Sequence, residues 1–258
     1  MKKIIVALTL AVYSTAWAAA KPEPSVLLYN LNTNITVVDH YSHTVRPMAS
    51  ITKLMTAIVA LDTGYALERR TNHRRRFGGV LPPKTYTRRE LLTAMLVRSD
   101  NSAAETLAND YPGGRAEFIQ EMNDRARSLG MKNTHFDDAS GLSATNITTA
   151  RDLAILLKEA LNYDFVREIS TTKATEITVP TKKHPNARVV ITNTNSPLLS
   201  EFTTVVSKTG LTSQAGWCVA MVIDEGGQRY IIVVLGAPNK NTRMKIVEKT
   251  VFANLRSN

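Results

Sequence analysis

The chain has 258 residues, of which 43% are apolar and 21% are charged, and its formal net charge is +10. This length suits one large domain or two small lobes, and the composition excludes an intrinsically disordered chain. With one cysteine the chain cannot form an internal disulfide, so its stability must come from a hydrophobic core. We interpret that residue, Cys218, as packed in the core, with a reactive thiol as the alternative.

The N-terminus has the features of an export signal. Two lysines precede the apolar run Ile4–Val12, which is too short to span a bilayer. Cleavage is expected at Ala16-Trp17-Ala18, with residues 18–20 as a second possible site, and this places a signal peptide at residues 1–18. An uncleaved membrane anchor is the alternative. The prediction is a periplasmic protein whose charge falls by two, from +10 to about +8, when the two lysines are removed.

The first elements after the signal are two short strands, expected over residues 26–29 and 35–39. A helix follows, because apolar residues recur at amphipathic spacing from Ile51 to Val59, and Gly64 is expected to end it. Residues 65–84 are basic and marked by glycine and proline, so we predict a loop there.

Two capping boxes mark the next helix starts. The first is Thr87-Arg88-Arg89-Glu90, and the second is Ser102-Ala103-Ala104-Glu105. Ser99-Asp100-Asn101 is therefore expected at the corner between two helices. Further helices are predicted over residues 115–129 and 150–161.

After Pro180 the pattern becomes that of β-strands. A hairpin is expected at Gly226-Gly227. Strands at both ends of the chain with helices between them predict an α+β fold, an antiparallel sheet flanked by helices with an inserted all-helical lobe at about 54–165. The pairing of the strands does not follow from the sequence. The expected C-terminal elements are strands over 188–192, 203–208, 217–223 and 230–235, and a helix over 242–255.

Three short motifs follow one another along the chain. Each is common by chance, but the set in this order is a strong signal. The motifs are Ser50-Ile51-Thr52-Lys53, Ser99-Asp100-Asn101 and Lys208-Thr209-Gly210. This set resembles the motif set of penicillin-binding proteins and class A β-lactamases.

From about Ser25 to the C-terminus, the chain resembles the low-molecular-mass penicillin-binding proteins. These are serine D,D-peptidases, and the resemblance is closest to their D-alanyl-D-alanine endopeptidase branch. It implies a β-lactamase/transpeptidase-like fold, with a catalytic domain over residues 19–258. Five further segments carry it: Pro47-Met48-Ala49-Ser50, Leu129-Gly130-Met131-Lys132-Asn133-Thr134, Ser140-Gly141-Leu142, Asn193-Thr194-Asn195 and Ala215-Gly216-Trp217-Cys218.

The first motif has the residues that a serine nucleophile needs. Ser50 stands at the predicted helix start, and Lys53 lies one turn later on the same face. A serine hydroxyl is a weak nucleophile until a base takes its proton, and a lysine can be that base if burial or a neighbouring cation lowers its pKa. The helix N-terminus also favours the negative charge that develops during attack. The alternative is that Ser50 caps the helix and Lys53 is solvated.

The second motif lies at the predicted corner, which could hold a hydroxyl rigidly above a cleft. The resemblance implies that Ser99 passes a proton to the leaving amine. It also implies that Asn101 forms hydrogen bonds with the substrate backbone and with Lys53. In the alternative interpretation Asn101 only caps the helix that begins at Ser102.

The third motif is expected to end a strand before a glycine turn. A cation there can hold a carboxylate, and Gly210 lets the backbone approach a ligand. Taken alone, the motif would be a surface turn. The resemblance implies that Lys208 and Thr209 hold the substrate carboxylate. It implies too that the backbone N–H groups of Ser50 and Leu211 form the oxyanion hole.

The expected function is a secreted serine D,D-peptidase that acts on peptidoglycan, without a cofactor or metal, and that β-lactam antibiotics inhibit covalently. Ser50 attacks the carbonyl of a D-alanine residue, an acyl-enzyme forms, and water hydrolyses it. The expected bond is the D-alanyl cross-link between two stem peptides. The closest histidines, His40 and His43, have no third metal ligand nearby, so a zinc site is not favoured.

Three other functions remain open. A D,D-carboxypeptidase often adds a C-terminal domain and an amphipathic membrane anchor. This chain ends about fifty residues after Lys208, and we expect no anchor after signal cleavage. A class A β-lactamase requires E-x-x-L-N, to which Glu159-Ala160-Leu161-Asn162 is one residue short. A non-catalytic peptidoglycan-binding module would not need Ser50 together with Lys53.

The basic surplus is clustered in a group of arginines between residues 69 and 89. We favour a solvated face slightly over attraction to an anionic polymer such as the cell wall. Nucleic acid is disfavoured as a partner, because the chain has an export signal and no aromatic residues interleave with these arginines. The region 65–84 is shorter and richer in arginine than the resemblance implies, which could alter the groove beside Ser99. The arginines concerned are Arg69, Arg70, Arg74, Arg75, Arg76, Arg88 and Arg89.

Overall fold

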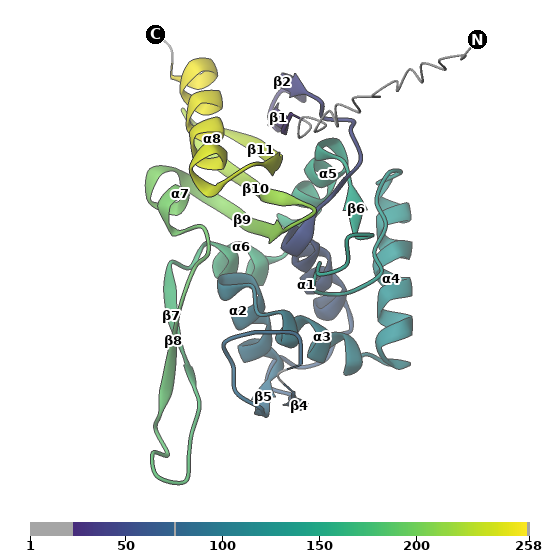
Figure 1. Cartoon of the computed structure of the whole chain (residues 1–258), viewed down its shortest axis with the longest axis vertical. Helices are drawn as coiled ribbons and strands as arrows, with labels where there is room; N and C mark the ends of the chain where they lie inside the picture. The colour runs from purple at the N-terminus through teal and green to yellow at the C-terminus, as the bar shows by residue number, and fades with distance from the viewer. Residues whose placement is uncertain (1–22, 75, 257–258) are drawn as a thin grey trace, which may run out of the picture.

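The computed structural model describes residues 23–74 and 76–256, so the predicted signal peptide lies outside the described residues. At its centre is a five-stranded sheet in the order β2-β1-β11-β10-β9, in which every neighbouring pair is antiparallel (Figure 1). The first two and last three strands of this order come from opposite ends of the chain. Their bounds are β1 Ser25–Asn30, β2 Ile35–His40, β9 Thr203–Thr212, β10 Gly216–Glu225 and β11 Gln228–Ala237.

Helices occupy the middle of the chain and cover one face of the sheet (Figure 1). An antiparallel sheet flanked by helices, with a helical lobe inserted between its strands, confirms the predicted α+β fold class. The helices of the lobe are α1 Lys53–Asp62, α2 Arg88–Arg98, α3 Asn101–Asn109, α4 Gly114–Leu129, α5 Ala150–Ala160 and α6 Asp164–Thr171.

The sheet is buried on both faces. Leu27 of β1 and Val233 of β11 belong to the core shared with the helical lobe, whereas Leu28 and Val234 pack toward α8 Lys240–Leu255. This alternation follows from the strand geometry, in which successive side chains point to opposite faces. Since both faces are covered, these strands are apolar runs rather than alternating ones.

Helix α1 is a core helix and not the amphipathic helix predicted from its spacing. All residues from Lys53 to Ala60 are buried, because the helix packs against α2, α3, α4 and α5. A helix that is surrounded by protein is apolar on every side. Its one charged residue in this stretch, Lys53, therefore lies in the protein interior.

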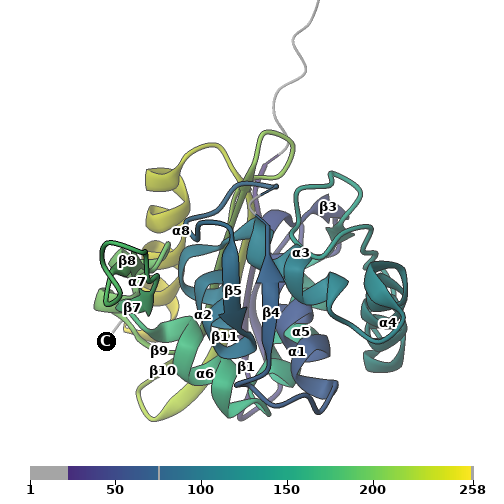
Figure 2. The same ribbon diagram turned by 90° about the horizontal axis from the view of Figure 1, so that it is seen from below.

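The prediction of a loop over residues 65–84 is partly wrong. β4 Arg70–His73 pairs with β5 Lys84–Thr87, and this small sheet lies over α2 and α3 (Figure 2). Buried His73 fastens it, with Nδ1 at 3.0 Å from the hydroxyl of Thr106 in α3. The strand pattern missed this pair because its residues are mostly polar.

Several short elements were not predicted, and β9, β10, β11 and α8 extend further than predicted. The unpredicted strand β7 Ala174–Thr178 pairs with the predicted β8 Arg188–Thr192 in a hairpin that projects from the body of the molecule (Figure 1). Within the described ranges, no helix is both long and apolar enough to cross a membrane. The other unpredicted elements are β3 Arg46–Pro47, β6 Ile147–Thr148, α6 and α7 Ser196–Glu201.

Hydrogen bonds and glycine conformations between neighbouring residues set several helix and strand ends where the sequence predicted them. The Thr87 hydroxyl accepts from the backbone N–H of Glu90, whose carboxylate accepts from the N–H of Thr87, so the first capping box is confirmed. Gly130 ends α4 with φ at 83°, a left-handed conformation that glycine adopts without strain. The β10–β11 hairpin turns at Gly226-Gly227 as expected.

Replacement of Thr87 by alanine should lower the free energy of unfolding by about 1 kcal/mol, because a backbone N–H at the start of α2 loses its acceptor. Urea denaturation followed by circular dichroism measures this change. Thr33→Ala is the control, since Thr33 is exposed in a turn; its effect should stay below about 0.5 kcal/mol. Equal losses in the two variants would contradict the capping role.

Candidate active site

The three motifs meet at one place, where the helical lobe abuts β9. Lys53 Nζ donates hydrogen bonds to Ser50 Oγ at 2.8 Å and to Asn101 Oδ1 at 2.7 Å. Lys208 Nζ donates to Ser99 Oγ at 3.0 Å. The tertiary fold thus joins a turn before α1, the corner between α2 and α3, and a strand of the sheet into one polar cluster.

Ser50 stands in a tight turn rather than in the α-helix itself. The turn is a 3₁₀-helix, Ala49–Thr52, and α1 begins at Lys53. Ala49 has φ at 48°, the left-handed region that a residue with a Cβ rarely adopts. Backbone strain of this kind persists only where the surroundings impose it.

Two glycines hold this turn in place by letting backbone approach it. A Cβ on Gly141 would lie 2.0 Å from the carbonyl oxygen of Ala49, and one on Gly210 would lie 2.8 Å from that of Met48 and 3.2 Å from Ser50 N. No other residue type fits either position without displacement. Ser50 is therefore held between β9 and the loop at Gly141, and its backbone N–H lies beside β9.

The Lys53 amine is fully buried, and this lowers its pKa to about 7. Burial disfavours the charged form of a lysine. The carboxylates of Asp138, Asp100 and Glu105 act in the opposite direction and raise the pKa. An amine with a pKa near neutrality and in contact with a serine hydroxyl can remove the serine proton.

A loop organised by Asp138 completes the surroundings of Lys53. The Asp138 carboxylate accepts from the backbone N–H groups of Ser140, Gly141 and Ser143. The carbonyl of Ser140 accepts a third hydrogen bond from Lys53 Nζ. The three donors of the charged amine are thereby all used, so its orientation toward Ser50 is fixed.

The corner at Ser99 has a different cap from the predicted one. Ser99 adopts φ of 64° and ends α2, and Asp100 caps α3 by accepting from the N–H of Ala103 at 2.9 Å. The second capping box is wrong, because Ser102 lies inside α3 and bonds to the segment 77–78. The interpretation of Asn101 as the cap is also wrong.

Asp100 fastens the corner to a second segment of the chain. Its Oδ2 accepts from the N–H of Val80 at 2.7 Å and of Leu81 at 3.2 Å. The Asn101 side chain makes a similar bridge, since its Nδ2 donates to the carbonyl of Phe77 at 3.2 Å. The 77–81 segment and the hydroxyl of Ser99 are therefore parts of one rigid arrangement.

The third motif lies within β9 and does not end it, contrary to the prediction. β9 continues to Thr212, because its pairing with β10 extends to Gly216. The buried amine of Lys208 has a pKa well below its ordinary value through burial and then the nearby Lys53 and Arg243 charges. The Thr209 hydroxyl contacts that of Thr194 at 2.6 Å.

Sequence reasoning missed Arg243, which lies on the buried face of α8. Its side chain is 1% exposed, and neither Nε nor Nη2 has a hydrogen-bond partner among the described residues. Its charge lies close enough to Lys208 to contribute to the lowered pKa of that amine. The available signal was its spacing: Arg243, Val247 and Val251 lie at i, i+4 and i+8, so the arginine interrupts an apolar stripe.

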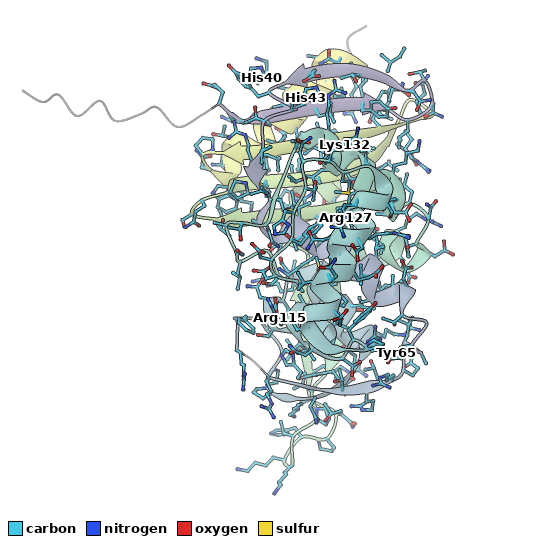
Figure 3. All side chains as sticks on the ribbon, turned by 90° about the vertical axis from the view of Figure 1, so that its right-hand side faces the viewer. His40, His43, Tyr65, Arg115, Arg127 and Lys132 are labelled. Atoms are coloured by element: carbon cyan, nitrogen blue, oxygen red, sulfur yellow. The ribbon has the colours of Figure 1, made fainter. Side chains whose placement is uncertain are left out.

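The other chemical candidates lie apart from this cluster. Cys218 is buried, as predicted for a core residue, and burial raises the pKa of its thiol to about 11. His40 and His43 lie near the β2 edge of the sheet (Figure 3). In the part of the chain that the structure describes, no three His, Cys, Asp or Glu residues are grouped as metal ligands.

Of the predicted site residues, the structure brings Lys53 into contact with Ser50 and Asn101, and Lys208 into contact with Ser99. Thr209, Gly210 and Leu211 follow along β9, and Leu211 is half exposed. Their catalytic and binding roles remain a prediction.

The chain is similar to proteins of one enzyme family. A D-alanyl-D-alanine endopeptidase of Escherichia coli (strain K12) is 35% identical over 246 residues, which cover 90% of this chain and 78% of that protein. The Streptomyces K15 DD-transpeptidase structure superposes with a TM-score of 0.83 at 27% identity, covering 90% of this chain and 97% of that one.

A third similarity concerns a protein with an antibiotic bound. Penicillin-binding protein D2 from Listeria monocytogenes, in its ampicillin-bound form, has a TM-score of 0.78 at 30% identity, and the match covers 89% of this chain and 96% of that one. The family model described as D-alanyl-D-alanine carboxypeptidase matches residues 14–239. With this match over most of its length, the chain belongs to the D-alanyl-D-alanine carboxypeptidase family of serine peptidases.

Proposed function

We propose that the chain is a D-alanyl-D-alanine endopeptidase that hydrolyses cross-links between peptidoglycan stem peptides through a serine acyl-enzyme. One observation carries the chemistry: the Lys53 amine, with its pKa lowered to about 7, contacts Ser50 Oγ at 2.8 Å. The similarity to the Escherichia coli endopeptidase supports the choice of bond. The same relationship supports β-lactams as covalent inhibitors, since related structures hold ampicillin or cefotaxime.

In the acylation step, Lys53 takes the proton from Ser50 Oγ, which attacks the carbonyl carbon of D-alanine. The backbone N–H groups of Ser50 and Leu211 bind the oxyanion that forms. The proton then reaches the leaving amine through Ser99, whose hydroxyl lies 3.0 Å from Lys208 Nζ. The C–N bond breaks and leaves an ester on Ser50, and water hydrolyses this ester to regenerate the hydroxyl.

Recognition of the substrate rests on the electropositive side of the cluster. Lys208 and Thr209 hold a carboxylate of the substrate, and the neighbouring charge of Arg243 adds to the attraction. Asn101 binds the substrate backbone, and Gly210 lets the extended peptide lie against β9. The substrate carboxylate would compensate positive charge that has no carboxylate partner in the described protein.

The enzyme would act outside the cytoplasm. The signal peptide at residues 1–18 would direct it to the periplasm and leave residues 19–258 as the catalytic domain. The mature charge of about +8, which is +10 less two lysines, suits a protein that works on an acidic polymer.

A D,D-carboxypeptidase that removes terminal D-alanine is the second candidate, and the description of the matching family favours it. A class A β-lactamase is less well supported. Glu159 of its nearest deacylation motif accepts from Arg125 at 2.7 Å and from Asn162 at 3.1 Å, at the end of α5, so its carboxylate is engaged away from Ser50.

Ser50→Ala should abolish covalent labelling by a fluorescent penicillin without unfolding the protein, because no nucleophile remains. Lys53→Arg should lower the acylation rate by at least about 100-fold, since a guanidinium keeps the charge but cannot act as a base. Gel fluorescence after timed incubation measures both. Ser213→Ala, in an exposed turn, is the control and should label like the wild type. Full labelling of Ser50→Ala would refute the assignment of the nucleophile.

The acylation rate should fall about tenfold for each pH unit below the Lys53 pKa of about 7, because the protonated amine cannot accept the serine proton. Stopped-flow measurement with a fluorescent penicillin gives the profile. A rate that is flat from pH 8 down to about 5 would remove Lys53 from the role of base.

Unfolding experiments test whether Lys53 is the group that titrates. The pKa of Lys53 is about 7 in the folded protein and 10.5 for an ordinary lysine. Between these two pH values the unfolded chain therefore binds one more proton than the folded protein. Stability should therefore rise with pH across this window. The difference in unfolding free energy between the wild type and Lys53→Met isolates this contribution, and an absence of slope would contradict it.

Purified enzyme should convert D-alanyl cross-linked muropeptide dimers into monomers and release little D-alanine from monomeric pentapeptide. Mass spectrometry of the products decides between the candidates. Predominant release of free D-alanine with intact dimers would identify a carboxypeptidase. Rapid hydrolysis of penicillin with neither peptide cleaved would identify a β-lactamase.

A further inference from the structure

A groove of about 430 Å³ lies beside the catalytic corner, between the segment after β4 and the helices α3 and α4. Its lining includes three arginines, Arg74, Arg76 and Arg115, with Phe77 and the carboxylates of Glu105 and Asp110. Arg115 stands at the start of α4 (Figure 3). The proposed mechanism uses none of these side chains, so the groove needs an explanation of its own.

The groove carries an excess of positive charge. Glu105 is paired with Arg115 at 2.7 Å, and Asp110 is paired with Arg88 at 3.0 Å. Each carboxylate in the lining thus already has a guanidinium partner. Arg74 and Arg76 are exposed, and their side chains have no hydrogen bond or ion pair with the residues that the structure describes. Two uncompensated guanidinium groups therefore face solvent at the groove.

The residues that follow Arg76, from Phe77 to Leu81, are fixed to the catalytic corner. Asp100 accepts from Val80 and Leu81, and a Cβ on Gly79 would lie 2.2 Å from Asp100 Oδ1. Phe77 donates its N–H to Ser102 Oγ at 3.0 Å and accepts from Asn101 Nδ2 at 3.2 Å. The groove accordingly adjoins Asn101, whose Oδ1 accepts a hydrogen bond from Lys53.

We propose that this groove binds carboxylate groups of a peptidoglycan stem peptide next to the scissile bond, with Arg74 and Arg76 as the binding residues. This inference rests on the proposed function and names where the acidic part of its substrate is held. Planar guanidinium groups pair with carboxylates through two parallel hydrogen bonds. The half-exposed ring of Phe77 between the arginines and Asn101 suits the aliphatic part of the same peptide.

An acidic peptide fits the groove better than a long anionic polymer does. A polyanion is attracted by positive charge spread over a surface, whereas this groove of about 430 Å³ presents two uncompensated guanidinium groups, which suits a small number of carboxylates. Phe77 lines the groove and its carbonyl accepts from Asn101, so the groove begins beside a residue that contacts Lys53. The experiment must therefore distinguish binding of peptide carboxylates from general attraction to an anionic polymer.

The test compares the double variant Arg74→Gln/Arg76→Gln with the wild type on two substrates. One is a cross-linked muropeptide dimer with free stem carboxylates, and the other is the same dimer with those carboxylates amidated. We expect KM for the free-carboxylate dimer to rise by about tenfold or more, with kcat changed less than about twofold. On the amidated dimer the variant and the wild type should have the same KM.

The matched control is Lys182→Gln/Lys183→Gln, which removes the same charge from exposed positions between β7 and β8. Its KM should equal that of the wild type on both dimers. Fluorescent penicillin, which lacks a stem peptide, reports whether the Ser50 centre is intact in every variant.

Three results would overturn the inference. One is an unchanged KM in the arginine variant on the free-carboxylate dimer. Another is an equal rise on the amidated dimer, which would mean that the arginines do not contact carboxylates. The third is an equal rise in the lysine control, which would mean general attraction to an anionic polymer.

If the wild type cleaves no dimer but is labelled by penicillin, the proposed function fails. The groove is then tested by calorimetric titration of Ser50→Ala, with and without the arginine changes, with the free and amidated monomeric stem peptides.

Discussion

The burial of the Lys53 amine is the constraint on which the rest of the site depends. Removal from water drives the pKa of the amine down to about 7, while Asp138, Asp100 and Glu105 raise it. Without these carboxylates, burial would lower the pKa of the amine still further. In water, by contrast, a lysine has a pKa of about 10.4 and remains charged at physiological pH. Because α1 is enclosed by other helices, the amine cannot escape to solvent. Packing of the helical lobe is thus what adjusts the basicity of the group beside Ser50.

The carboxylates around Lys53 also determine the backbone of the site. Asp138 collects the N–H groups of the loop that carries Ser140 and Gly141, and Asp100 caps α3 while it holds the 80–81 backbone. Glu105 accepts from the N–H of Ala139 at 3.1 Å. Each acidic group therefore has a structural role as well as an electrostatic one. Its hydrogen bonds fix the backbone around it, and its charge acts on the amine of Lys53.

The 77–81 segment connects the catalytic corner with the arginine groove, because it is bonded to the corner and its first residue, Phe77, lines the groove. Contacts of Asn101 and Ser102 with Phe77 join them on one side, and Asp100 joins them on the other. A region that reads in the sequence as a basic loop is therefore anchored at its end nearest the nucleophile. In the proposed complex, the positive charge of Arg74 and Arg76 lies where a bound peptide would extend.

The sequence by itself determined the elements whose boundaries depend on neighbouring residues. The Thr87–Glu90 box, Gly130 after α4 and the Gly226-Gly227 turn act through hydrogen bonds and dihedral angles within a few residues, so they could be predicted. The order of the three motifs indicated the enzyme class. Tertiary structure alone decided that α1 is buried on every side, that Asp100 caps α3 in place of the predicted Ser102, and that β9 continues past Gly210. It also decided that Arg243 lies near Lys208 and which groups Lys53 contacts. Burial and charge depend on residues that are distant in the chain, so no local sequence pattern contains them.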